Sequence, residues 1–284
     1  MRHTMTPLLV ATLLAPMLGA QEKSDAGGDR KARVAAVQKE FETAQREVID
    51  RYQAAKDDAE RQKIIADMPK QDVFAKKLWP IVDEAPTDEA SAKALCWIAN
   101  AAEGADKQKA CDLLLQHHLA RPEIADVLQS MVYEPSASSL AFLERVAKDA
   151  PSADVKGKAL FAQAQLCNQI VETANRLAGG NDEELKNFLE YLGAERSAWL
   201  RGIDKKAFAA RAEALFDKVV ADHAKVAMYD GTLGDLAKAE LFETRNLAIG
   251  KVAPDIVGKD ADGNPMKLSD YRGKVVVLDF WGEW

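Results

Sequence analysis

The chain has 284 residues, of which 48% are hydrophobic and 29% are charged, so it is long enough to bury a core and to hold one or two domains. Its net charge is −7, and an acidic chain without a basic patch interleaved with aromatic residues is not expected to bind nucleic acid. Aromatic residues make up only 7% of the chain and alanine is plentiful, which favours closely packed helices.

The first twenty residues have the pattern of a targeting segment. Arg2 and His3 precede an apolar run over residues 7–18, and Gly19-Ala20 ends it. This run is shorter than the roughly 20 residues that cross a bilayer. The pattern therefore predicts a signal peptide over residues 1–20 rather than a membrane anchor. We expect export to the periplasm or cell envelope, no stable membrane insertion after cleavage, and a compartment in which disulfides persist.

A linker and a long helix are predicted next. Residues 21–31 are polar and contain a glycine pair, which is typical of a linker. From Val34 to Ala55, apolar or small residues recur at spacings of three and four, which predicts an amphipathic helix that packs on its own domain. Self-association through a coiled coil over 34–55 is the alternative, although Arg51 interrupts its heptad pattern. Pro69 is expected to end the helix.

The rest of the chain up to residue 247 alternates apolar periodic segments with short turn signals. Small residues over 155–166 and 212–220 resemble the helices of tetratricopeptide (TPR)-like repeats, but no fixed period is maintained. Short turns favour antiparallel helical pairs. We therefore expect a mainly α fold, with an irregular antiparallel helical solenoid as an α-helical domain over 32–248. The predicted segments are 73–82, 87–98, 107–119, one opening at Pro122, 136–147, 155–177, 182–200, 207–223 and 233–245.

The sequence changes character at Ile249-Gly250, where Gly, Pro and Asp become frequent, and we place a domain boundary there. Residues 260–265 predict a turn between two short strands, over 254–259 and 266–268. Residues 269–273 predict a single helical turn.

The last segment contains the continuous apolar run Val275 to Leu278, which predicts a buried strand. A buried strand needs neighbours on both edges, and an unpaired edge is an aggregation liability. Because the printed sequence ends at Trp284, we expect the chain to be a fragment of a longer protein.

This end of the chain carries a family resemblance. The motif Asp279-Phe-Trp-Gly-Glu-Trp284 resembles the strand that enters the active site of thioredoxin-like proteins. Upstream, Gly250-Lys-Val-Ala-Pro-Asp255, Asp260-x-Asp262-Gly263 and Leu268-Ser-Asp-Tyr-Arg-Gly-Lys274 are similar to the lead-in of TlpA-like and redoxin (AhpC/TSA) domains. The resemblance implies that 249–284 is the N-terminal part of a thioredoxin-like α/β domain, truncated just before its Cys-x-x-Cys motif.

The resemblance also implies a function and site residues. Asp279 matches the buried carboxylate that lies behind the cysteine pair and accepts its proton, while Trp281 and Trp284 match aromatics that flank the active site. Relatives with peroxidase activity usually have Phe-Tyr-Pro here, so the tryptophans favour an exported thiol-disulfide oxidoreductase. The resemblance implies protein thiols or disulfides, or a redox partner, as the partners, and no cofactor. Because the cysteine pair is absent, this chain is expected to be inactive by itself. A helical binding or scaffold module with an appended redox domain, and a redoxin-type peroxidase, remain as alternatives.

The three cysteines all lie in the helical region, and none has Cys-x-x-Cys spacing. Buried, reduced side chains are the simplest expectation. Cys96 and Cys111 lie nearly equidistant from the predicted turn at 103–106, so an antiparallel pair would place them at the same height, and a disulfide between them is the alternative. Adjacent His117 and His118 would point about 100° apart on a helix, and no metal site is expected.

Overall fold

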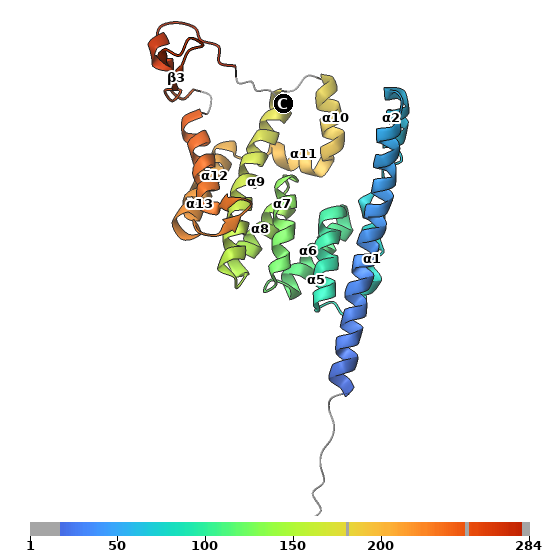
Figure 1. Cartoon of the computed structure of the whole chain (residues 1–284). Coiled ribbons are helices and arrows are strands. Elements are labelled where there is room, and N and C mark those ends of the chain that lie inside the picture. The colour runs from blue at the N-terminus through green and yellow to red at the C-terminus, as the bar shows by residue number, and fades with distance from the viewer. Residues whose placement is uncertain (1–17, 180–181, 248–249, 280–284) are drawn as a thin grey trace, which may run out of the picture.

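The structure is a computed structural model that describes residues 18–179, 182–247 and 250–279. It is mainly helical, with two short hairpins towards the C-terminus (Figure 1). The residues predicted as a signal peptide lie largely outside the described part of the chain. Among the described helices, none combines the length and the apolar content that a membrane crossing requires.

The N-terminal half is organised around α5 (Glu89–Ala101), which packs against α6 (Gly104–His117) and is covered by α1 (Leu18–Ala54). The side chain of Asp88 caps α5 by accepting a hydrogen bond from the backbone N–H of Ser91, at the start of the helical segment predicted over 87–98. Two short helices, α3 (Gln71–Lys76) and α4 (Trp79–Glu84), contact both α1 and α5, whereas α2 (Asp58–Ile65) packs on α1.

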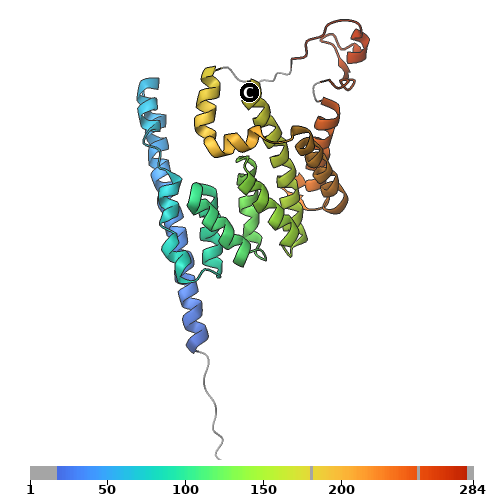
Figure 2. The ribbon, with the colours of Figure 1, turned by 180° about the vertical axis from the view of Figure 1, so that it is seen from behind.

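The C-terminal half is organised around the longest core helix, α9 (Ala153–Gly179), which packs against helices that precede and follow it (Figures 1 and 2). One hydrophobic core runs through both halves, from Val34 to Leu241. The remaining elements of this half are η1 (Pro122–Ile124), α7 (Ala125–Val132), α8 (Ala137–Asp149), α10 (Asp182–Leu192), α11 (Ala194–Arg201), α12 (Lys205–Asp222), the hairpin β1 (Ala227–Met228) and β2 (Gly231–Thr232), and α13 (Leu233–Phe242).

Consecutive helices pack in pairs, notably α5 with α6, α8 with α9 and α12 with α13. The predicted mainly α fold is confirmed, whereas a TPR-like solenoid is not.

Three predicted boundaries differ from the structure. The helix α1 runs through residues 21–31, which were expected to be a linker. The helix expected to continue to Met68 stops at Ala54, because Asp57 caps a new helix by accepting from the N–H of Glu60. The helix expected over 182–200 is two helices, separated at Gly193, whose φ of 75° lies in the left-handed region that glycine adopts without steric cost.

The reason that α1 extends through the expected linker is visible at Arg30. Its side chain is only 8% exposed and donates hydrogen bonds to the carbonyl of Ile81 and to Ser91 Oγ (3.0 Å), and it forms an ion pair with Asp88. Arg30 therefore fixes the first half of α1 against the turn between α4 and α5.

The helical body ends in a π-helical turn, η2 (Glu243–Leu247), directly after α13. In this turn Arg245 reaches back to α12, with its Nε 2.5 Å from the carboxylate of Glu213 and one terminal nitrogen 2.7 Å from that of Asp217.

The C-terminal segment forms β3 (Val257–Lys259), β4 (Pro265–Lys267) and the short 3-10 helix η3 (Leu268–Tyr271). None of its residues belongs to the hydrophobic core of the helices, and both ribbon views show it apart from them (Figures 1 and 2). The expected hairpin and single helical turn are confirmed. The buried strand expected over 275–278 is wrong for this structure: the residues form no strand, and Val275 is 99% exposed, because no neighbouring strand lies beside them in the described part of the chain.

Candidate functional site

The lead-in to the expected redox site begins with a hairpin held by one carboxylate. Asp260 accepts hydrogen bonds from the backbone N–H groups of Asp262 (3.0 Å) and Asn264 (2.8 Å) and from the Asn264 side chain (3.1 Å). These bonds, led by that of the Asn264 side chain, hold the pKa of Asp260 below its ordinary value. Gly263 completes the turn with a φ of 85°. The Asp-x-Asp-Gly motif therefore forms a turn in which the Asp260 carboxylate accepts its hydrogen bonds from residues of the turn itself.

A second carboxylate ties the two ends of this segment together. Asp255 accepts from the backbone N–H of Ser269 (2.8 Å) and from its hydroxyl (2.9 Å), and these bonds lower the pKa of Asp255. Beside this link, the N–H of Leu268 donates to the carbonyl of Ile256 (2.9 Å). Sequence reasoning quoted Asp255 and Ser269 as parts of two separate motifs and missed their contact. Both are polar residues next to a predicted strand, and this was the only available signal.

Of the three residues expected to surround the chemistry, the structure describes Asp279 alone. Asp279 is exposed and belongs to no strand. Trp281 and Trp284 lie outside the described residues. Within the described chain, the segment up to 279 thus supplies a lead-in scaffold without an assembled catalytic centre, and the roles of these three residues stay predictions.

The cysteines of the helical body are poor candidates for the missing nucleophile. All three are buried free thiols, and burial raises the pKa of Cys96 and of Cys111 to about 12 and that of Cys167 to about 11. A thiolate is the reactive species, so these groups are almost wholly unreactive near neutral pH. The Cys96 thiol donates to the carbonyl of Glu123 (3.2 Å). A disulfide between Cys96 and Cys111 stays a prediction for the protein after oxidation.

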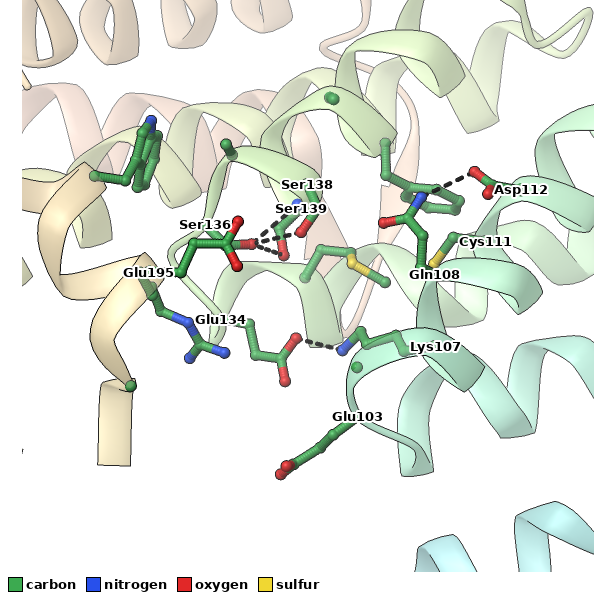
Figure 3. Close-up of a pocket in the computed structure, with 18 of the residues that line it drawn as sticks. Glu103, Lys107, Gln108, Cys111, Asp112, Glu134, Ser136, Ser138, Ser139 and Glu195 are labelled. Atoms are coloured by element: carbon green, nitrogen blue, oxygen red, sulfur yellow. Dashed lines mark hydrogen bonds and ion pairs between the residues drawn. The ribbon is translucent and has the colours of Figure 1, made fainter. Parts of the chain in front are cut away.

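A separate concave feature lies in the helical body, where a groove of about 770 Å³ opens between α6, the start of α8 and α11 (Figure 3). The side chains of Lys107 and Glu134 form an ion pair across one part of it, 14% and 26% exposed respectively. Ser136 caps α8 there by accepting from the N–H of Ser139 (3.1 Å). Sequence reasoning found no site in this region, because the lining comes from separate helices and includes no known motif.

Neither region holds a cluster that suggests a metal. Within the residues that the structure describes, no group of three or more His, Cys, Asp or Glu side chains is arranged to bind an ion. The two adjacent histidines differ in environment: His117 is exposed, whereas His118 is fully buried, with its Nε2 2.7 Å from the carbonyl oxygen of Pro86.

Comparison with known proteins places the similarity at the C-terminal end. Residues 249–284 match the AhpC/TSA family. The chain is 47% identical over 53 residues to the thiol-disulfide oxidoreductase ResA of Geobacillus thermodenitrificans, which covers 18% of this chain and 30% of that protein. It is 52% identical over 42 residues to ResA of Geobacillus kaustophilus, covering 15% and 24%, and 39% identical over 57 residues to ResA of Bacillus anthracis, covering 20% and 28%. No solved structure matches the chain. The chain thus spans less than a third of the length of these relatives.

Proposed function

We propose that the protein is a thiol-disulfide oxidoreductase. The premise is that residues 249–284 make this chain a redoxin or thioredoxin-like protein. The observation that carries the proposal is the similarity to proteins named ResA together with the AhpC/TSA match. The hairpin and the Asp255–Ser269 link support it, because they use the motif residues of 250–274 to shape the lead-in.

The reaction needs a thiolate that attacks a disulfide sulfur and a second thiol that resolves the mixed disulfide. The raised pKa values of Cys96, Cys111 and Cys167 argue against these residues in either role. We assign the chemistry to a cysteine pair of the Cys-x-x-Cys type, with Asp279 as its proton acceptor and with Trp281 and Trp284 beside it.

The domain organisation belongs to the same proposal. Residues 1–20 act as a signal peptide, residues 32–248 form a helical domain, and residues 249–284 begin the redox domain. The protein works in the periplasm or cell envelope. The apolar run over residues 7–18 supports export, and a hydrophobic core that ends at Leu241 supports the division between the domains.

The test uses the product of the whole reading frame that encodes this chain, assayed for reduction of insulin disulfides by dithiothreitol. We expect catalysis above the uncatalysed rate. The triple variant C96A/C111A/C167A should keep that rate, because its missing thiols are buried and protonated, and D279N should lower it. Absence of catalysis, or its loss in the triple variant, would overturn the proposal.

A peroxidase is the second candidate, favoured specifically by the AhpC/TSA match. It predicts that the same product consumes hydrogen peroxide at the expense of a thiol and reduces insulin disulfides poorly.

In a third candidate function, the helical domain is a binding module to which the redox domain is attached, and its helix pairs pack in a TPR-like way. The groove between α6, α8 and α11 favours this role for the domain.

A further inference from the structure

The groove between α6, α8 and α11 has the character of a polypeptide-binding surface. Its floor and walls combine partly or fully buried apolar side chains with polar groups that can bond a peptide backbone. Leu115, Ala141 and Trp199 supply accessible apolar surface, while Gln108, Ser136 and Ser138 supply hydrogen-bonding side chains. Protein interfaces typically combine an apolar centre of this kind with a polar rim.

A second hollow lies beside the groove. Leu192 lines both the groove and this hollow, which has a volume of about 180 Å³ and lies on the side of α9 and α10. Tyr133 and Tyr191 line this second hollow and are 69% and 68% exposed. Exposed tyrosines are common where one protein binds another, since each offers a large rigid ring and a polar hydroxyl. An extended chain that lies across Leu192 contacts both hollows, whereas a compact small molecule fills only one of them.

The charges of the groove favour a basic occupant. Lys107 is already paired with Glu134, and Arg145 with Asp149. Three carboxylates remain on the lining, those of Glu103, Asp112 and Glu195, opposite the single cation Arg196. Among the described residues no ion pair involves these three carboxylates, and Asp112 accepts only from the neutral amide of Gln108 (2.9 Å). The carboxylate of Glu103 lies at the edge of the groove and points away from the Lys107–Glu134 pair (Figure 3).

We propose that this groove binds an extended, lysine- or arginine-rich polypeptide segment and so holds the protein on which the attached redox domain acts. The clause about the redox domain rests on the function proposed above, whereas the binding itself does not. The apolar surface takes side chains of the segment, the hydroxyl and amide groups bond its backbone, and the three carboxylates attract its cations.

The experiment measures binding directly. A fluorescein-labelled short peptide of lysine, serine and leucine, and its counterpart with glutamate for each lysine, are titrated with the full chain and followed by fluorescence anisotropy. We expect the lysine peptide to bind, increasingly weakly as salt is raised, and the glutamate peptide not to bind. Absence of binding by the lysine peptide, or equal binding by the two peptides, overturns the proposal.

Two variants locate the binding. In E103Q/E195Q, binding should weaken roughly three- to tenfold, the loss expected for two solvent-exposed ion pairs. In A141W, a large ring replaces an exposed alanine on the groove wall and should abolish binding without lowering the melting temperature. The matched control E42Q/E47Q makes the same charge change on the exposed face of α1 and should bind as the wild type does.

The outcomes separate the two proposals. If E42Q/E47Q weakens peptide binding as much as E103Q/E195Q does, binding responds to net charge alone and the groove proposal is overturned. Undiminished peptide binding by A141W would overturn it too. Because the assay needs no redox chemistry, peptide binding together with failure to reduce insulin would overturn the proposed function and leave the groove standing. Insulin reduction without peptide binding would overturn the groove proposal and support the proposed function.

Discussion

At the scale of single residues, His118 shows how burial gives one side chain a pH dependence. The imidazole is fully buried at the C-terminal end of α6, and burial lowers its pKa below the ordinary value of 6.5. The groups that face it are the carbonyl of Pro86, which opposes this shift, the cation of Arg121, the ring of His117 and the more distant carboxylate of Asp88. The folded protein therefore favours the neutral ring.

The sign of the effect on stability follows from proton binding. Below pH 6.5 the unfolded chain takes up a proton at this histidine more readily than the folded chain does, so stability falls as the pH falls through that window. Above pH 6.5 the contribution is fully present.

We predict that the melting temperature drops between pH 7 and pH 5, and that H118Q drops less, because glutamine does not titrate and can still donate to Pro86. The measurement is thermal unfolding followed by circular dichroism across this range. The control H117Q changes the exposed neighbour and should keep the wild-type slope. An unchanged slope in H118Q would contradict the assignment.

At the scale of elements, the attachment of α1 rests on the buried Arg30. Replacing it with methionine keeps much of the volume but leaves the carbonyl of Ile81 and the carboxylate of Asp88 without their partner. Leaving a buried acceptor such as the Ile81 carbonyl without its donor costs about 1–3 kcal/mol, and Asp88, which is 33% exposed, adds less than a fully buried carboxylate would. We predict a loss of this size in the free energy of unfolding of R30M, measured with urea.

The matched variant R33M separates burial from charge. Arg33 lies one turn further along α1 and forms an ion pair with Glu84 (2.8 Å), but both side chains are well exposed. Its loss should change stability little, because exposed pairs contribute little. Equal losses in the two variants would show that burial of Arg30 does not set the cost.

The same helix shows what sequence patterns could and could not predict. Helices with regular apolar spacing and a clear cap, such as 137–149 and 153–179, were anticipated to within a few residues. For residues 21–31 the sequence predicts a linker, because their polar composition and glycine pair carry no sign of the distant partners Ile81 and Asp88 of Arg30. The break at Gly193 was missed because one glycine is tolerated inside many helices.

The candidate sites show the same difference between contacts close in sequence, which can be predicted, and contacts between distant residues, which cannot. The turn around Asp260 could be predicted, since its carboxylate bonds residues within four positions of itself. The Asp255–Ser269 link and the groove join residues distant in sequence, for which spacing gives no information. The prediction of a strand over 275–278 was wrong, because an apolar run forms a strand only where neighbouring strands pair with it.

At the scale of the whole molecule, the described residues after 249 contribute nothing to the hydrophobic core of the helices. That core ends at Leu241, and in the described part of the chain β3 packs on β4 and β4 on η3. We predict that deleting 250–284 leaves the helical circular-dichroism signal and the melting temperature nearly unchanged. Loss of cooperative melting would instead show that the two parts share a core.

The position of Arg245 limits how far the C-terminal segment can lie from the helical body. Its ion pairs with Glu213 and Asp217 join η2 to α12, and β3 begins twelve residues later, at Val257. Even fully extended, that length spans roughly 40 Å. A polypeptide held within this radius meets the segment at a local concentration on the order of millimolar, whatever its concentration in solution. A polypeptide bound to the helical body would thus meet the C-terminal segment of the same molecule, so that even weak binding leads to frequent contact between the two.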